Sequence, residues 1–164
     1  MKAQTLNESL GSSLFNKYIF LSYRRKDRDY VTKVAEFLEK LSAKVYIDYL
    51  DDELPSTPSD ATAIILRSRI QKCRKVIQFV TPNSSGSKWM PWELGLGDGL
   101  LGYRNSVILP TSIDSNNSVD QEYLNIYGSI KMESIYESFY PLDDEWIVKY
   151  PQGQQVSLKV WLNN

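Results

Sequence analysis

The sequence predicts an α/β fold in which helices cover a central parallel sheet. Short apolar runs rich in β-forming residues alternate along the chain with longer segments whose apolar residues recur at helical spacing. The short runs are continuously apolar, which is typical of strands buried on both faces. Strand and helix alternate up to a fourth strand, and this order is typical of a parallel sheet flanked by helices.

Four strands are expected where these short runs occur. The first run, "YIFLSY", ends in a polar loop, "RRKDRD", and the others end in similarly polar segments. Because sites on parallel sheets gather at the carboxyl ends of the strands, these loops are the places to look for function. The predicted strands cover 18–23, 43–49, 76–81 and 106–112.

Three helices are expected between the strands. The first covers 30–43, where valines and leucines recur at helical spacing. The second follows a long acidic loop with two prolines and begins at Ser59 or Asp60, either of which is a plausible N-cap. The third begins in "SKWMPWE" with Ser87 as N-cap, because Pro91 fits only in the first turn of a helix.

The two ends of the chain differ from this repeating pattern. Residues 1–16 are polar and lightly patterned, so we expect a flexible leader before a single domain over 17–164. Residues 145–157 read as two short strands around a "PQGQ" turn, and this predicts a C-terminal β-hairpin. Trp146 and Trp161 are expected to pack on the core.

Composition excludes several classes of function. The 164 residues carry a net charge of −1 without a long basic run, which argues against a nucleic-acid partner. No apolar run is long enough to span a bilayer, and the N-terminus lacks a signal-peptide core, so we expect a cytoplasmic protein without a membrane partner. There is no histidine, and Cys73 is the single cysteine. Imidazole-dependent triads, His-ligated metals and thiolate zinc clusters are therefore excluded.

The segment "SKWMPWELGLGDG" (87–99) contains the most informative motif. Trp89 and Glu93 are four residues apart near a helix start, so an aromatic ring and a carboxylate share one helical face. Such a pair suits a ribose with an attached ring. The alternative is structural, because an acidic residue near a helix N-terminus is stabilised by the helix dipole alone. The glycines do not match a phosphate-binding loop, and we expect them to permit close packing.

Polar residues at two other strand ends are further candidates. Tyr23 and Arg24 follow the first strand, where a guanidinium could bind phosphate, or the turn could simply be solvated. Asp48 follows the second strand and is either a cap or a ligand group. The spacing of the residues leaves both alternatives open.

Taken together, the motifs resemble the Toll/interleukin-1 receptor (TIR) family, in particular its stand-alone bacterial members. "IFLSYRRKD" resembles the first conserved box, "KVYIDYLDDELP" the second strand and BB loop, and "VIQFVTPNSSGSKWMPWE" the third strand and the Trp-x-x-x-Glu helix start. The resemblance covers about 17–112. It implies a flavodoxin-like fold and, in enzymatic members, cleavage of the nicotinamide–ribose bond of NAD+.

The resemblance also implies roles for individual residues. Glu93 corresponds to the catalytic glutamate and Trp89 to its partner, while Ser22, Tyr23 and Arg24 would line the nucleotide pocket. NAD+ is then the substrate, with no cofactor and no metal, and the product is ADP-ribose or a cyclic or derivatised form. The best-fitting role is the TIR subunit of a Thoeris-like anti-phage system, whose product activates a separate effector. Self-association is expected through the BB-loop region, 50–60.

Two rival functions remain at this point. The first is a non-enzymatic TIR module that acts by self-association. The second is an N-glycosidase of the nucleoside 2-deoxyribosyltransferase type, which also places a glutamate on ribose. Pro91 and Trp92 are not general features of TIR domains, so they are the residues expected to reshape the pocket and its product.

Overall fold

The computed structural model describes residues 18–48, 57, 59–111, 122–133 and 145–164. The predicted leader, 1–16, and all of the BB-loop region except residues 57, 59 and 60 lie outside the described residues. The strands are β1 (Tyr18–Ser22), β2 (Lys44–Tyr46), β3 (Lys75–Val80), β4 (Ser106–Pro110), β5 (Gly128–Glu133), β6 (Glu145–Lys149) and β7 (Gln155–Ser157). The helices are α1 (Arg28–Lys40), α2 (Asp60–Lys72), α3 (Trp89–Leu101) and α4 (Leu158–Asn163).

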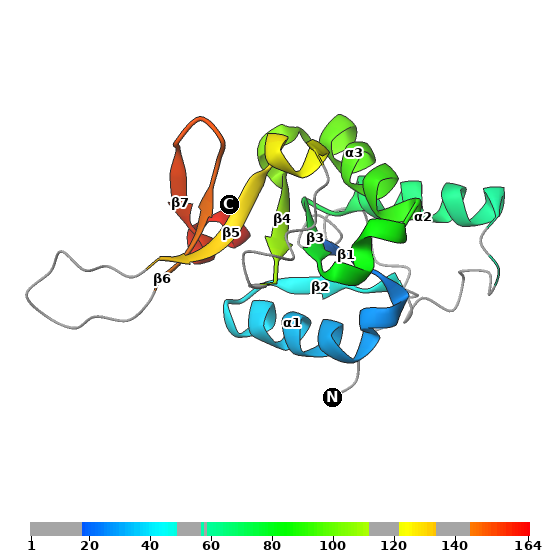
Figure 1. The fold of residues 1–164 in the computed structure, drawn as a ribbon, viewed down its shortest axis with the longest axis horizontal. Helices are drawn as coiled ribbons and strands as arrows, with labels where there is room; N and C mark the ends of the chain where they lie inside the picture. Colours follow the sequence, from blue (N-terminus) through cyan, green and yellow to red (C-terminus); the bar gives the residue numbers. More distant parts are fainter. Residues whose placement is uncertain (1–17, 49–56, 58, 112–121, 134–144) are drawn as a thin grey trace, which may run out of the picture.

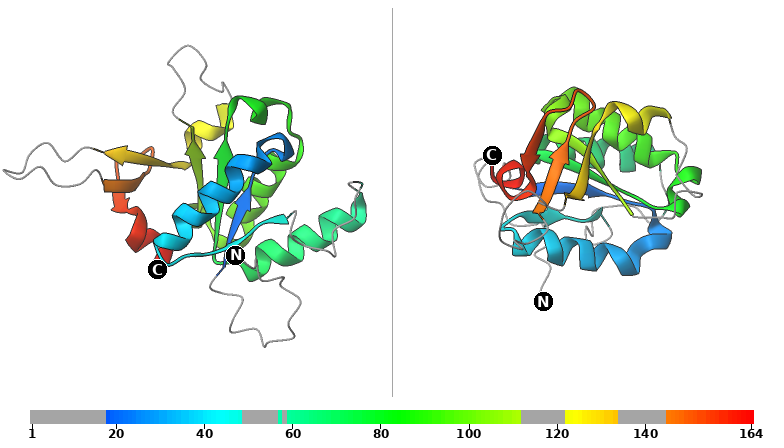
Figure 2. Two further views of the ribbon diagram at one scale, coloured as in Figure 1. Left: turned by 90° about the horizontal axis from the view of Figure 1, so that it is seen from below. Right: turned by 60° about the vertical axis from the view of Figure 1, so that its left-hand side comes forward.

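The strands form one mixed sheet in the order β2-β1-β3-β4-β5-β6-β7. Strands β1 to β5 pair in parallel, as predicted for the first four. Strands β5, β6 and β7 then pair antiparallel, with β6 and β7 at the positions predicted for the C-terminal hairpin. Figure 2 shows this hairpin and α4 at one end of the molecule and α2 at the other.

Strand β5, which joins the hairpin to the rest of the sheet, was not predicted from the sequence. The residues of β5 become exposed toward its end, at Lys131 and Met132, so the strand lacks the nearly continuous burial of β1 and β3. The hairpin was predicted as part of the single domain, without a strand that connects it to the parallel sheet. Instead β5 links it to β4 within one continuous sheet.

The sheet separates two apolar cores, because successive side chains of a strand point to opposite faces. In β1, Ile19 and Leu21 belong to the core beneath α1 and α4, whereas Phe20 belongs to the core beneath α2 and α3. Figure 1 shows α1 on one side of the sheet and α2 and α3 on the other. Trp161 is buried in the first core, and Trp146 is half-buried with its ring centre 5.0 Å from that of Phe37.

Helix boundaries follow the predicted signals closely. Helix α2 begins with a capping box, in which Ser59 and Thr62 exchange side-chain-to-backbone hydrogen bonds. Helix α3 begins at Trp89 with Lys88 at the N-cap position, one residue later than the predicted N-cap Ser87. The Ser87 Oγ nevertheless accepts a hydrogen bond from the Met90 backbone N–H at 3.2 Å. Ser157 occupies the N-cap position of α4 without forming a side-chain capping bond.

The glycines of α3 are not equivalent. A Cβ atom built at Gly97 would lie 2.5 Å from Cγ2 of Val76 and 3.0 Å from Oγ of Ser106, so only glycine lets this helix approach the sheet so closely. At Gly95 and Gly99, no heavy atom lies within 4 Å of the corresponding position. The expectation of close packing therefore holds at Gly97 alone.

Candidate active site at the carboxyl edge of the sheet

Glu93 and Ser22 meet at the carboxyl end of β1. The Ser22 hydroxyl donates a hydrogen bond of 2.5 Å to Oε2 of Glu93, although the two residues are 71 positions apart in the sequence. Both residues are buried, with exposed fractions of 1% for Ser22 and 6% for Glu93. The β1 register places Ser22 on the face covered by α3, so the strand and the helix bring together two residues that the sequence analysis had predicted.

The environment of Glu93 opposes its ionisation. Burial raises the pKa of its carboxyl to about 8; the hydrogen bond from Ser22 lowers that pKa, and the negative charge of Asp48 raises it. A buried carboxyl whose pKa lies near neutrality can change protonation state during a reaction, as catalytic acids and bases do. A helix-dipole role alone would not require burial or a partner at the end of another strand.

Asp48 lies two residues beyond β2 and is half-buried. Its effect on the pKa of Glu93 places its carboxylate within electrostatic range of the Glu93 carboxyl. The second and first strands are neighbours in the sheet, so their carboxyl ends lie side by side. The structure therefore brings Asp48 toward the Ser22–Glu93 pair.

Two tryptophans flank Glu93 at the start of α3. The rings of Trp89 and Trp92 meet edge to face, with their centres 5.4 Å apart and an interplanar angle of 89°. Both are half-buried against the core beneath α2 and α3. The guanidinium carbon of Arg67, from α2, lies 6.0 Å from the centre of the Trp92 ring. These contacts fix the two tryptophan rings relative to each other, and the cation–π contact holds the Trp92 ring against α2.

Tyr23 and Arg24 take different directions. Tyr23 is buried in the core beneath α1, together with Leu21 and Val31. This corrects the prediction that its side chain lines the pocket with Ser22, because consecutive residues of an extended chain point to opposite faces of the sheet. Arg24 is half-buried, and one of its guanidinium nitrogens lies 3.9 Å from the Cβ position of Gly86, in the loop that leads to α3.

Two polar features of this edge were not predicted from the sequence. The first is Gln78 of β3, which is fully buried and lies opposite Ser22 in the strand register. Its Nε2 donates to the Tyr123 hydroxyl at 3.0 Å, while its Oε1 accepts no hydrogen bond from the described residues. A glutamine inside an otherwise apolar strand was the available signal, because such a group is rarely buried without a role.

The second missed feature is Asp27, which joins two loops. Its carboxylate accepts hydrogen bonds from the Thr81 hydroxyl and from the Asn83 amide, both at 2.6 Å. Asp27 follows β1, whereas Thr81 and Asn83 follow β3, so this buried carboxylate fixes the position of the first loop relative to the loop before Glu93. The described residues contain no group of three or more His, Cys, Asp or Glu side chains able to hold a metal ion.

Within the part of the chain that the structure describes, no helix combines the length and the hydrophobicity needed to cross a membrane.

Cys73 follows α2 and is buried, and burial raises the pKa of its thiol to about 12. A thiol with that pKa is not a nucleophile near neutral pH. Cys73 also lies just before the amino end of β3, at the opposite edge of the sheet from Glu93, so it does not contribute to the candidate site.

Two curated proteins are similar in sequence to this chain. A protein named "Probable 3' cyclic ADP-D-ribose synthase ThsB'", from Bacillus cereus (strain MSX-D12), is 34% identical over 149 residues, which cover 88% of this chain and 74% of that protein. A second, named "Putative cyclic ADP-D-ribose synthase TIR2", from Cytobacillus dafuensis, is 29% identical over 79 residues, or 46% of this chain and 21% of that protein.

Among solved structures, the TIR domains of the activated Roq1 resistosome, recognising the pathogen effector XopQ, are similar to 57% of this chain and 55% of their own, with 22% identity and a TM-score of 0.43. The family model described as "TIR domain" matches residues 19–139. This range contains Ser22, Asp48, Trp89 and Glu93, and it confirms the resemblance predicted from the motifs. The chain therefore belongs to the TIR domain family.

Proposed function

We propose that this chain cleaves the nicotinamide–ribose bond of NAD+ and closes the resulting ADP-ribose into a cyclic product. The buried hydrogen bond between Ser22 and Glu93, at the carboxyl edge of a TIR sheet, is the observation that supports this function best. The printed names of both curated relatives, each a cyclic ADP-D-ribose synthase, favour a cyclic product over simple hydrolysis. A scaffold module would not need a carboxyl buried beside a serine.

The proposed reaction begins with departure of nicotinamide. The bond between the ribosyl carbon and the pyridinium nitrogen breaks, and its electron pair leaves with nicotinamide, which becomes neutral. Positive charge then develops on the ribosyl carbon and its ring oxygen. The Glu93 carboxylate stabilises that charge, with Ser22 holding one of its oxygens in place.

Capture of the ribosyl carbon completes the reaction. A nucleophile of the same ADP-ribose forms the new bond to this carbon; if that nucleophile is a hydroxyl, its proton has to leave. Glu93 is suited to accept this proton, because burial raises the pKa of its carboxyl to about 8. The tryptophan pair of Trp89 and Trp92 limits access of water, which favours ring closure over hydrolysis.

Its biological role follows from the product. A small cyclic nucleotide is a diffusible signal, so we place this chain in a Thoeris-like anti-phage system in which a separate effector senses the product. The enzyme is proposed to work in the cytoplasm, where NAD+ is available. Self-association that completes the pocket is part of this proposal.

The function is tested by supplying NAD+ to the purified protein and resolving nicotinamide, ADP-ribose and cyclic ADP-ribose isomers by chromatography with mass spectrometry. We expect nicotinamide and a cyclic isomer in equal amounts. Glu93→Gln removes the charge with little change in shape and should lower the rate of nicotinamide release about 100-fold or more. Glu39→Gln, at an exposed glutamate of α1, is the matched control and should leave the rate unchanged.

Other results select other functions. If the wild-type protein and Glu93→Gln are equally inert under conditions that promote assembly, the protein is a self-association module. If deoxynucleosides are cleaved and NAD+ is not, it is an N-glycosidase of the deoxyribosyltransferase type. Linear ADP-ribose as the single product would retain NAD+ cleavage and overturn the proposed cyclisation.

A further inference from the structure

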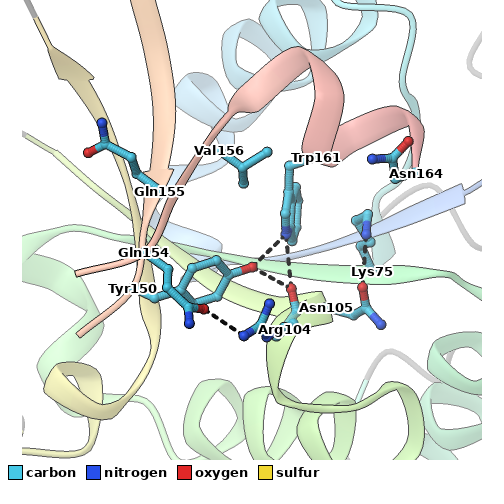
Figure 3. A pocket seen from close by; sticks show the side chains of 9 residues that line it. All are labelled: Lys75, Arg104, Asn105, Tyr150, Gln154, Gln155, Val156, Trp161 and Asn164. Carbon is cyan, nitrogen blue, oxygen red and sulfur yellow. Dashed lines mark hydrogen bonds between the residues drawn. The ribbon is translucent and has the colours of Figure 1, made fainter. Parts of the chain in front are cut away.

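A second polar pocket lies at the opposite edge of the sheet from Glu93. Lys75 is the first residue of β3 and Asn105 directly precedes β4, so both lie at the amino ends of parallel strands. The β6–β7 hairpin and α4 supply the other walls, including Gln154 and Trp161. Figure 3 shows these side chains around the pocket, whose volume is about 240 Å³.

Lys75 brings a buried positive charge to this pocket. The residue is 5% exposed; its Nζ donates to the Asn105 Oδ1 at 2.8 Å and lies 4.6 Å from the centre of the Trp161 ring. No carboxylate among the described residues forms an ion pair with it. Burial, followed by the positive charge of Arg74, lowers the pKa of Lys75 to about 8. A buried charge normally has a counter-charge, and here neutral groups take that place.

Arg104 brings a second positive charge. It donates to Oε1 of Gln154 at 2.6 Å, and its guanidinium carbon lies 5.9 Å from the centre of the Tyr150 ring. Its backbone carbonyl accepts hydrogen bonds from the Tyr150 hydroxyl at 2.8 Å and from Trp161 Nε1 at 2.9 Å, so the backbone at this position is fixed (Figure 3). The described residues provide no carboxylate partner for this guanidinium either.

We propose that this pocket binds a small phosphate-bearing anion between Lys75 and Arg104. Two cations line one cavity, and their partners there among the described residues are amides and aromatic faces, so a bound anion would be the counter-charge of both. A guanidinium matches the oxygens of a phosphate bidentately, and an ammonium adds a point charge beside it. At about 240 Å³ the pocket suits a phosphate or pyrophosphate group. The site is separate from the one proposed to cleave NAD+.

The site is tested by isothermal titration calorimetry of the full chain with inorganic pyrophosphate and, in a second arm, with ADP. Arg104→Gln removes the charge at an exposed side chain, so the variant should fold normally. We expect it to weaken pyrophosphate binding about tenfold or more, as loss of a charge-assisted hydrogen bond does. Lys159→Gln, an equal charge change at an exposed residue of α4, should bind as the wild type does.

Binding of pyrophosphate or ADP is assigned to this pocket only if the wild type shows it and Arg104→Gln does not. If ADP binds there more tightly than pyrophosphate, the ligand is a nucleoside phosphate; if not, it is a free phosphate. Lys75→Gln, which keeps an amide donor toward Asn105, should weaken the same binding. Equal affinities in the wild type, Arg104→Gln and Lys159→Gln, or no binding at millimolar concentration, would overturn the proposal. Nicotinamide release should stay unchanged in Arg104→Gln, so this test is independent of the proposed NAD+ cleavage.

Discussion

At the scale of single residues, the burial of Glu93 and its proposed role favour different protonation states of its carboxyl. Its burial against the sheet favours the neutral acid, and the proposed chemistry uses the carboxylate. In the proposed reaction NAD+ would resolve this conflict, because its positively charged nicotinamide ring favours the ionised form of a nearby carboxyl. The site is therefore prepared to become charged when the substrate arrives.

This conflict predicts the pH dependence of the reaction. Because the pKa of Glu93 is about 8 in the ligand-free protein, kcat/KM for NAD+ should rise with pH below this value and level off above it. Steady-state rates of nicotinamide release across this range measure the profile. A profile that is flat on both sides of the pKa would contradict a role for the ionised carboxylate.

Ser22 should determine the pH at which kcat/KM rises. Its hydrogen bond lowers the pKa of Glu93, so Ser22→Ala should raise that pKa further and displace the rising limb to higher pH. The control is Ser106→Ala, at a buried serine on the strand edge opposite the site. A loss of rate in Ser22→Ala without displacement of the limb would mean that Ser22 acts otherwise than through Glu93.

Glu93 should also lower the stability of the protein at high pH. Its pKa is about 8 in the folded state and ordinarily 4.5, so between these values the folded protein binds more protons and loses stability as pH rises. Glu93→Gln should therefore have a higher Tm than wild type above pH 8, and the difference should vanish near pH 4.5. Thermal unfolding followed by circular dichroism tests this, with Glu39→Gln as the control; equal Tm values at high pH would contradict it.

Sequence patterns identified those site residues that stand next to recognisable signals. Ser22 is the last residue of β1 and Asp48 follows β2, while Trp89 and Glu93 lie in the first turns of α3. Gln78 was missed because its place beside Ser22 depends on strand register, which no local pattern encodes. The direction of the Tyr23 side chain depends on the same register. Asp27 was missed because its partners are more than fifty residues away.

At the scale of elements, the approach of α3 to the sheet positions the site. Gly97 lies one helical turn after Glu93, and its missing side chain sets the distance between helix and sheet. Buried strands and capped helices were predicted from their apolar runs and cap residues, whereas β5 was missed because half of it faces solvent. A partly exposed strand inside a sheet has a weaker apolar sequence pattern than a fully buried strand.

Gly97→Ala should destabilise the protein. Its Cβ would overlap the β-branched side chain of Val76, and overpacking of this kind costs about 1–3 kcal/mol, more than the gain in helix propensity of up to about 1 kcal/mol. Gly95→Ala and Gly99→Ala are matched controls on the open face of the same helix and should raise stability. Urea unfolding measures all three; equal stability changes at the three positions would contradict the packing argument.

At the scale of the whole molecule, the C-terminal segment is part of the same folding unit as the parallel strands. Trp161 is buried in the core beneath α1 and donates to the Arg104 carbonyl and the Tyr150 hydroxyl. Trp161→Ala should lower the free energy of unfolding by about 3–5 kcal/mol and keep a single transition. Val160→Ala, at a half-exposed neighbour, should change it little.

Coincidence of the unfolding curves distinguishes one folding unit from two. Circular dichroism reports the whole sheet, and tryptophan fluorescence reports Trp89 and Trp92 near Glu93 as well as Trp146 and Trp161 in the tail. We expect the two probes to give the same midpoint for wild type and for Val160→Ala. Separate midpoints would mean that the hairpin and α4 unfold independently of the parallel strands.

The core beneath α1 also has a consequence for synthesis on the ribosome. Helix α1 is synthesised well before the C-terminal segment, yet its buried residues share one apolar core with Leu158, Trp161 and Leu162, and the ring of Phe37 contacts that of Trp146. These partners are more than a hundred residues later in the chain, and such distant contacts form slowly. A nascent chain therefore exposes an apolar surface until its last strands are made, so translation speed and chaperone binding should govern the yield of folded protein.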